Sequence, residues 1–212
     1  EAAVDKPDLI IWPEAAVSGF LFRQEDERIF KNIFSLAKDL NTNLLIGSVV
    51  EDNSCYFNSA ILINLDGKIV KRYDKLHLVP FGEYIPLKEI LGFLETVVPI
   101  GDFMPGKEYT VFSLIEATGQ RGNGSAKFSA LICFEDLFPE LARKFVRQGA
   151  GFLVNITNDA WFGRTSSPFQ HVALSVMRAV ENRRFLVRAA NTGVSAFITP
   201  EGAIKSLVSD NK

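Results

Sequence analysis

Cysteine and long hydrophobic runs are both scarce in this sequence. Only two cysteines, Cys55 and Cys133, occur among 212 residues. They are too few for a disulfide scaffold, and neither has the paired Cys/His spacing of a zinc site. The most apolar stretches, residues 44–50 and 129–134, are far shorter than the roughly 20 residues of a membrane-spanning helix. We therefore expect no spanning segment within these residues, and a reactive thiol is one role open to a lone cysteine.

An excess of charge of either sign is also missing. The chain has 23 Lys+Arg against 25 Asp+Glu, a net charge of −2, and it contains no basic stripe interleaved with aromatic residues. This balance argues against a nucleic-acid partner. The content of 47% apolar and 23% charged residues instead indicates a single globular domain with a continuous buried core.

Histidine is equally scarce, and its two copies form no metal-binding pattern. His77 and His171 are far apart in the sequence, and neither has a carboxylate or thiol partner at ligand spacing. Isolated histidines of this kind more often have structural roles than metal-binding ones. We therefore expect no metal ion and no other cofactor.

Short apolar runs and amphipathic segments alternate along the chain, which is typical of a layered α/β protein. The spacing predicts helices at residues 25–41, 139–148 and 168–184, and a hairpin turn at Asp66-Gly67. The last helix is expected to bury the apolar face formed by Phe169, Val172, Ala173, Val176, Met177 and Val180. Strands are predicted at residues 9–12, 44–50, 57–65, 68–73, 128–133, 151–156, 185–189 and 195–199.

One long segment, residues 79–107, is rich in proline and glycine. We interpret it as a loop with one short helix near residues 87–94. Loops of this length inside a compact domain usually carry function. The segment is therefore expected to contribute to the active site.

Three chemically reactive residues, Glu14, Lys75 and Cys133, each follow directly from a predicted strand. Because loops at strand ends of an α/β sheet converge on ligand sites, the three side chains are candidates for one site. A carboxylate can deprotonate a thiol, and an ammonium group can stabilise both a thiolate and an oxyanion. Taken singly, each residue also has an ordinary role, as a buried core cysteine, a first-turn glutamate or a solvated loop lysine.

The surrounding residues resemble a known superfamily. Trp12-Pro13-Glu14, the run from Lys75 to Pro86 (KLHLVPFGEYIP) and Ile132-Cys133-Phe134-Glu135-Asp136 are similar to the three signature segments of the nitrilase, or carbon–nitrogen hydrolase, superfamily, and occur in the same order. The resemblance extends from about Asp8 to Gly202. It implies a four-layer αββα sandwich in which Glu14, Lys75 and Cys133 form a catalytic triad.

Several further segments resemble the apolipoprotein N-acyltransferase branch of that superfamily. They are Pro-Phe-Gly-Glu-Tyr after the lysine, the Asn-Asp-Ala-Trp-Phe-Gly segment at residues 158–163, and Gln170-His171, Arg178-Ala179 and Asn191-Thr192-Gly193. In that branch the cysteine takes an acyl chain from a membrane phospholipid as a thioester. The chain then passes to the N-terminal amine of a diacylglyceryl-cysteine apolipoprotein. The resemblance thus implies a phospholipid donor and an apolipoprotein acceptor as partners.

The triad and its neighbours can be given roles on chemical grounds. Glu14 would accept the thiol proton, and Lys75 together with the backbone N–H of Phe134 would stabilise the oxyanion. The resemblance implies that Glu83 orients Lys75 and that Glu135 assists near the nucleophile. From the sequence alone, Glu83 could equally be an exposed loop charge.

Aromatic residues near these motifs have two possible roles. Trp161 and Phe162 could wall an acyl pocket or could be ordinary core aromatics, and Tyr84 is a further candidate for substrate binding. Cys55 lies in a polar turn before a strand and is expected to take no part in the reaction.

Two other functions are compatible with the same motifs. One is a soluble amidase or nitrilase-type hydrolase in which water replaces the amine as the second nucleophile. The other is a catalytically silent nitrilase-like interaction module, which the presence of Glu14, Lys75 and Cys133 argues against. The long loop at residues 79–107 and the segment around Trp161 resemble the acyltransferase more than they resemble soluble hydrolases.

We interpret residues 1–212 as one nitrilase-like catalytic domain. The sequence begins at Glu1 without an initiator methionine or a targeting segment. Compared with the family, it is expected to lack a first strand and helix, the last strand or strands and a bundle of transmembrane helices. The resemblance implies the extramembrane catalytic domain of a bacterial inner-membrane enzyme, facing the periplasm.

Overall fold

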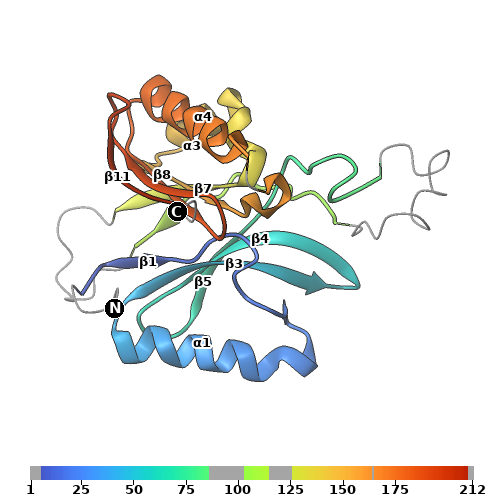
Figure 1. Ribbon diagram of the computed structural model, residues 1–212. Coiled ribbons are helices and arrows are strands. Elements are labelled where there is room, and N and C mark those ends of the chain that lie inside the picture. Colours follow the sequence, from blue (N-terminus) through green and yellow to red (C-terminus); the bar gives the residue numbers. More distant parts are fainter. Residues whose placement is uncertain (1–5, 86–102, 115–125, 164, 210–212) are drawn as a thin grey trace.

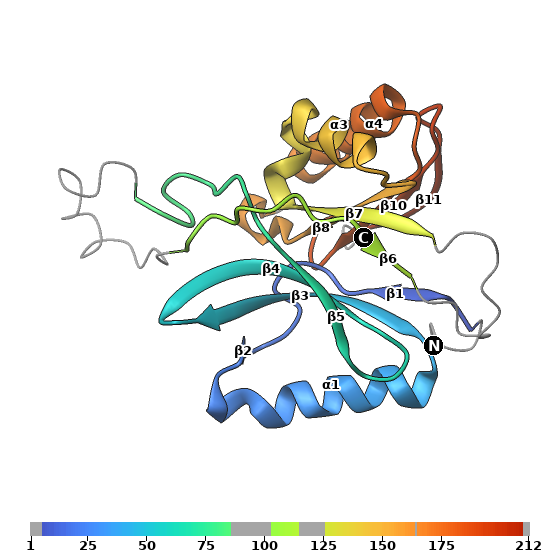
Figure 2. The same cartoon turned by 180° about the vertical axis from the view of Figure 1, so that it is seen from behind.

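Four layers of secondary structure make up the computed structural model, which describes residues 6–85, 103–114, 126–163 and 165–209. Helix α1 (Glu27–Leu40) covers the first sheet, and helices α3 (Pro139–Arg147) and α4 (Ser167–Asn182) cover the second (Figure 1). The two sheets face one another between these helical layers, as the reverse view also shows (Figure 2). The predicted αββα sandwich is thus confirmed.

The first sheet has the order β1-β3-β4-β5, with the short β2 paired to β3. The hairpin predicted at Asp66-Gly67 connects β4 to β5. Asn64 stabilises this turn, since its side-chain oxygen accepts hydrogen bonds from the N–H groups of Asp66 and Lys68. Gly67 has a φ of +72°, and a Cβ there would collide with the carbonyl of Phe34 in α1. The strands are β1 (Leu9–Ile11), β2 (Phe20–Leu21), β3 (Asn43–Asp52), β4 (Cys55–Ile63) and β5 (Ile69–Asp74).

The second sheet has the order β11-β10-β9-β8-β7-β6. Strands β7, β8 and β9 are parallel to one another, and the remaining pairings are antiparallel. The sequence analysis missed β11, because its residues are almost all exposed and show no apolar alternation. The strands are β6 (Phe112–Ser113), β7 (Lys127–Ile132), β8 (Phe152–Thr157), β9 (Leu186–Ala190), β10 (Val194–Ile198) and β11 (Ile204–Ser209).

The core lies mainly between the two sheets. Leu45 and Leu62 from the first sheet and Ala130 and Leu153 from the second are fully buried in one apolar cluster. A second cluster lies beneath α1 and takes Phe30, Ile33 and Ala37 from that helix. Because the central strands are buried on both faces, they form a rigid frame that fixes the positions of the loops at their ends.

The buried face of α4 overlaps the predicted one only in part. Phe169, Met177 and Val180 were expected to be covered, but their side chains are 47%, 51% and 45% exposed. Val172 is buried as predicted, but the buried face also carries polar residues, His171 and Ser175 among them. These side chains form hydrogen bonds with Asp136 in the 3₁₀ turn η3 (Cys133–Leu137). Apolar periodicity cannot reveal a helix face that is buried through polar contacts.

The short helix predicted near residues 87–94 lies outside the described residues. Within the described part of the chain, no helix is long and apolar enough to cross a membrane.

Candidate active site

The structure brings Glu14, Lys75 and Cys133 together at one pocket. Glu14 follows β1, Lys75 follows β5 and Cys133 follows β7, so both sheets contribute to the site. The three residues are 8%, 1% and 6% exposed, and Lys75 Nζ lies 3.8 Å from Glu14 Oε1. All three line a pocket of about 430 Å³. A carboxylate, an ammonium group and a thiol therefore share one largely buried space.

The backbone of Cys133 adopts an unusual conformation. Its φ is +53°, in the left-handed region that favours glycine, so the residue is held in place by its surroundings. It is the first residue of η3, directly after β7, and this sharp turn presents the side chain at the carboxyl end of that strand. Burial, followed by the charge of Glu14, raises the pKa of the thiol to about 12, while Lys75 acts to lower it. The thiol is therefore protonated near neutral pH and needs a base to react.

Lys75 is held between two carboxylates. Its Nζ lies 2.8 Å from Glu83 Oε2, in addition to the longer contact with Glu14. Burial alone would lower the pKa of Lys75, but the charges of Glu14, Glu83 and Cys133 outweigh it, and the net shift is upward. Lys75 is therefore protonated, and the ion pair with Glu83 fixes the orientation of its ammonium group.

Glu14 accepts two hydrogen bonds that orient its carboxylate. The Asn58 side chain donates to Oε1 and the backbone N–H of Asn158 donates to Oε2, both at 2.8 Å. Burial raises the pKa of Glu14, and the charge of Lys75 acts against it. The chain at Glu14 also lies directly against β3, since a Cβ on Gly47 would sit 2.7 Å from Glu14 Cα. Glu14 is thus a fixed, buried carboxylate with a raised pKa, two properties that suit a proton acceptor.

Asn58 is a site residue that the sequence analysis missed. Its side-chain nitrogen also donates to Glu83 Oε1 at 2.7 Å, so it bridges Glu83 and Glu14. Its carbonyl accepts the N–H of Lys75 at 2.9 Å. An asparagine in the mainly apolar strand β4 was the available signal, and it could not indicate the partners.

Glu135 lies behind the pocket and links two of its loops. The fully buried carboxylate accepts the N–H groups of Leu76 and His77, which follow Lys75, and of Ile132, which precedes Cys133. The Tyr73 hydroxyl donates to it as well. Burial raises the pKa of Glu135 to about 7, against the effect of these hydrogen bonds.

The walls of the pocket are mainly apolar. Phe134 lines the pocket, and its ring stacks on His171 with a centroid distance of 5.0 Å. Phe162 packs edge-on against Phe134 at 5.7 Å. Neither Phe162 nor Tyr84 is among the described residues that line the pocket, and the side chain of Trp161 lies outside the described part of the structure. The other apolar lining residues are Ala15, Val49, Val79, Pro80, Phe81 and Phe103.

The remaining candidates lie apart from the pocket lining. His77 stacks on Phe138 at 4.2 Å, and Cys55 is a half-buried residue at the start of β4. His171 has two carboxylate neighbours in space, Asp136 and Asp159, that its sequence spacing did not reveal. Within the described ranges, no group of three or more His, Cys, Asp or Glu side chains could hold a metal ion.

Sequence comparisons agree with this architecture. The model of the carbon-nitrogen hydrolase family matches residues 1–212. The chain is 44% identical over 97% of its length to a Geobacter metallireducens protein named apolipoprotein N-acyltransferase, and covers 38% of that protein. It is 35% identical to a Treponema denticola protein named apolipoprotein N-acyltransferase 2, of which it covers 40%. The chain therefore spans about two fifths of the length of these relatives.

Solved structures share the fold at low sequence identity. Nit3 of Saccharomyces cerevisiae, a nitrilase superfamily member, superposes with a TM-score of 0.68 at 21% identity, covering 99% of this chain and 76% of Nit3. An amidase from Nesterenkonia gives a TM-score of 0.70 at 20% identity, with 98% and 75% covered. These neighbours confirm the nitrilase-type sandwich. By its full-length family match and its fold, the chain belongs to the carbon–nitrogen hydrolase family.

Proposed function

We propose that this chain is the catalytic domain of an apolipoprotein N-acyltransferase, with Cys133 as nucleophile. The observation that carries the proposal is the shared pocket of Glu14, Lys75 and Cys133 in a chain 44% identical to a protein of that name. The acyl donor is a phospholipid, and the acceptor is the N-terminal amine of a diacylglyceryl-cysteine apolipoprotein. The enzyme acts at the inner membrane of a bacterium, with this domain on the periplasmic face.

The first step forms a thioester. Glu14 takes the thiol proton as the Cys133 sulfur attacks the carbonyl carbon of the phospholipid ester. The tetrahedral intermediate then breaks its bond to the glycerol oxygen, which receives the proton back from Glu14. Lysophospholipid leaves, and the acyl chain remains on Cys133. The raised pKa of Glu14 supports this role, because a more basic carboxylate accepts a thiol proton more readily.

The second step transfers the chain to the amine. The α-amino group attacks the thioester carbonyl, Glu14 accepts a proton from the nitrogen, and the carbon–sulfur bond breaks to leave an amide. The departing Cys133 thiolate recovers its proton from Glu14, which restores the starting enzyme. Glu14 thus begins and ends each step as a carboxylate, and Cys133 regains its proton only at the end of the second step.

Lys75 stabilises the negative charge that develops on the substrate oxygen. Its ammonium group is held by the 2.8 Å ion pair with Glu83, and the backbone N–H of Phe134 is the second donor. Loss of one such donor typically slows a reaction by about 10²–10³-fold. Glu83 and Asn58 act through Lys75 and Glu14, because their contacts fix both groups.

The apolar walls of the pocket support an acyl substrate. Val49, Phe81 and Phe103 are among the residues that surround the triad, and such walls bury a hydrocarbon chain favourably. Phe81 is 53% exposed, so apolar surface continues from the pocket to the outside.

A fatty-acyl adduct on Cys133 tests the proposal. The protein is incubated with phospholipid and its intact mass is measured. We expect an increase equal to one acyl group in the wild type and in Cys55→Ala, and none in Cys133→Ala. An adduct that persists in Cys133→Ala, or that disappears in Cys55→Ala, would refute the assignment of the nucleophile.

A further inference from the structure

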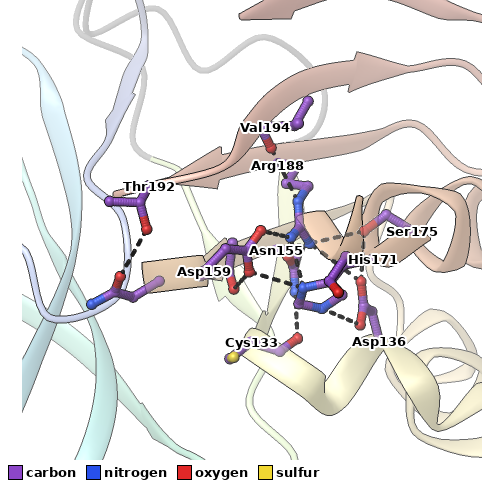
Figure 3. Close-up of polar contacts among 12 residues, drawn as sticks. Cys133, Asp136, Asn155, Asp159, His171, Ser175, Arg188, Thr192 and Val194 are labelled. Atoms are coloured by element: carbon purple, nitrogen blue, oxygen red, sulfur yellow. Dashed lines mark hydrogen bonds and ion pairs between the residues drawn. The ribbon is translucent and has the colours of Figure 1, made fainter. Parts of the chain in front are cut away.

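A buried polar cluster lies directly behind Cys133, and the proposed reaction does not use it. Its six side chains are at most 2% exposed and come from strands β8 and β9, from the turns that follow β7 and β8, and from α4. Figure 3 shows that they converge on the guanidinium group of Arg188. We call this group the Arg188 cluster; its members are Asp136, Asn155, Asp159, His171, Ser175 and Arg188.

Arg188 uses its guanidinium group to connect separate elements. From its position on β9, Nη1 donates to Asn155 Oδ1 on β8 at 2.5 Å, and Nη2 donates to Asp159 Oδ2 at 2.9 Å. Nε donates to the Val194 carbonyl at 3.1 Å. A planar fork of donors can satisfy these separate acceptors together, whereas a lysine ammonium group is a single point charge.

The cluster balances its charges when His171 is protonated. The His171 ring lies between two carboxylates, with Nε2 3.0 Å from Asp136 Oδ1 and Nδ1 2.9 Å from Asp159 Oδ1. Two carboxylates then face two cations, His171 and Arg188, which offsets the cost of their burial. Arg188 Nη2 also lies 2.9 Å from His171 Nδ1, and this contact between like charges acts against protonation of the ring. Removing Arg188 would leave an excess of negative charge beside the nucleophile.

One branch of the cluster reaches the backbone of the nucleophile. The Asn155 side-chain nitrogen donates to the carbonyls of Cys133 at 3.0 Å and Leu131 at 3.2 Å, so it clamps the turn in which Cys133 has its left-handed φ. Figure 3 shows the Cys133 carbonyl directed at the cluster and its sulfur on the opposite side. Because Arg188 binds the amide oxygen of Asn155, the amide nitrogen must face these carbonyls.

A second branch reaches the general base. Arg188 holds Asp159 at the start of the short turn η4 (Asp159–Phe162), and the Thr157 hydroxyl donates to the same carboxylate at 3.0 Å. Asn158 lies between these two residues, and its backbone N–H is the donor to Glu14 Oε2. The position of that N–H therefore depends on the Arg188–Asp159 ion pair.

We propose that Arg188 is a positioning residue that aligns Cys133 and Glu14 with one another through Asn155 and Asp159. The inference rests on the proposed function, which gives Cys133 the role of nucleophile and Glu14 the role of base. Arg188 touches neither substrate nor thiol, and it acts by fixing the backbone on which each reactive group stands. Misplacing reacting groups by about 1 Å can cost about 100-fold in rate.

The test measures the reactivity of the Cys133 thiol with iodoacetamide, which does not depend on any lipid. Alkylation of Cys133 is followed by peptide mass spectrometry near neutral pH and well below the melting temperature. We expect Arg188→Gln to slow alkylation by about 10- to 100-fold. Arg188→Lys should recover only a small part of the rate, because it keeps the charge without the fork of donors.

A second variant covers the case in which Arg188→Gln does not fold. Asn155→Asp keeps an acceptor for Arg188 but replaces the two N–H donors to Leu131 and Cys133 with an oxygen. It should slow alkylation as much as Arg188→Gln does. The control is Arg184→Gln, at a half-buried arginine whose hydrogen bonds go to the carbonyls of Ala150 and Arg183, away from the pocket. The control should lower the melting temperature and leave the alkylation rate within about twofold.

The outcomes separate this inference from the proposed function. If Arg188→Gln or Arg188→Lys alkylates as fast as the wild type, or if Arg184→Gln is slowed equally, Arg188 has a structural role only. If the Arg188 variants are slow while the wild type forms no acyl adduct with phospholipid, the positioning role is supported and the acyltransferase assignment fails. If Arg188→Gln forms the adduct at the wild-type rate, the acyltransferase assignment stands and the positioning role fails.

Discussion

Replacing Glu135 with glutamine is expected to remove a specific pH dependence of stability. The carboxylate is fully buried and accepts hydrogen bonds from Tyr73, Leu76, His77 and Ile132. Burial raises its pKa from the model-compound value of 4.5 to about 7, although the hydrogen bonds act in the opposite direction. The folded protein therefore binds a proton at Glu135 more tightly than the unfolded chain does.

The size of the effect follows from this pKa difference. A shift from 4.5 to about 7 corresponds to about 3 kcal/mol of unfolding free energy, at about 1.4 kcal/mol per pH unit. Because the pKa is raised in the folded state, this stabilisation is fully present below pH 4.5 and is lost as the pH rises to about 7. Glutamine cannot ionise, so Glu135→Gln should not show this loss.

Urea unfolding at about pH 4.5 and about pH 8 measures the difference. The free energy of unfolding of the wild type should fall by about 3 kcal/mol more than that of Glu135→Gln between these conditions. Glu181→Gln, at a half-exposed carboxylate that pairs with Arg178, controls for the change in net charge. Equal pH dependence in the wild type and Glu135→Gln would show that burial does not dominate at this carboxylate.

Three further predictions concern the pocket. Glu83→Gln removes the 2.8 Å ion pair with Lys75 and should lower the rate of acyl-adduct formation about 10- to 100-fold in stopped reactions; an unchanged rate would contradict the orienting role. Glu14 must be ionised to act as a base, and its pKa is raised. The rate of adduct formation should therefore decline on acidification at a higher pH than it would with an ordinary glutamate. A rate that stays constant down to about pH 4.5 would exclude Glu14 as the base. Gly47→Ala places a Cβ 2.7 Å from Glu14 Cα and should lower the free energy of unfolding by about 1–3 kcal/mol, measured with denaturant. Gly151→Ala, whose Cβ has its nearest contact at 3.3 Å, should lower it less. A larger loss for Gly151→Ala would contradict the steric argument.

The sequence predicted those parts of the structure that depend on local patterns. Helix α1 was recognisable because Ile29, Ile33, Ala37 and Leu40 recur at helical spacing, although its buried face takes Phe30 in place of Ile29. The β4–β5 hairpin was recognisable because Asp66-Gly67 suits a tight turn. The apolar pattern of α4 was misleading. That helix is covered on the side where His171 and Ser175 meet Asp136, and such pairing exists only in three dimensions.

The same limit applied to the site. Short motifs identified Glu14, Lys75 and Cys133, since each directly follows a strand and carries reactive chemistry. Asn58 and Arg188 lie inside strands, where a single polar residue gives no indication of its partners. Asn58 contacts Glu83, 25 positions away, and Arg188 contacts Asn155, 33 positions away. Contacts of this kind are determined by sheet order and register, which the sequence pattern did not reveal.

The fate of the acyl chain on Cys133 tests the central claim most directly. The protein is first acylated with phospholipid and separated from free lipid, and a diacylglyceryl-cysteine lipopeptide with a free N-terminal amine is then added. We expect the chain to leave Cys133 and appear as an amide on the lipopeptide, with little free fatty acid. Release of the chain mainly as free fatty acid, at a rate that the lipopeptide does not change, would contradict the account and favour a hydrolase.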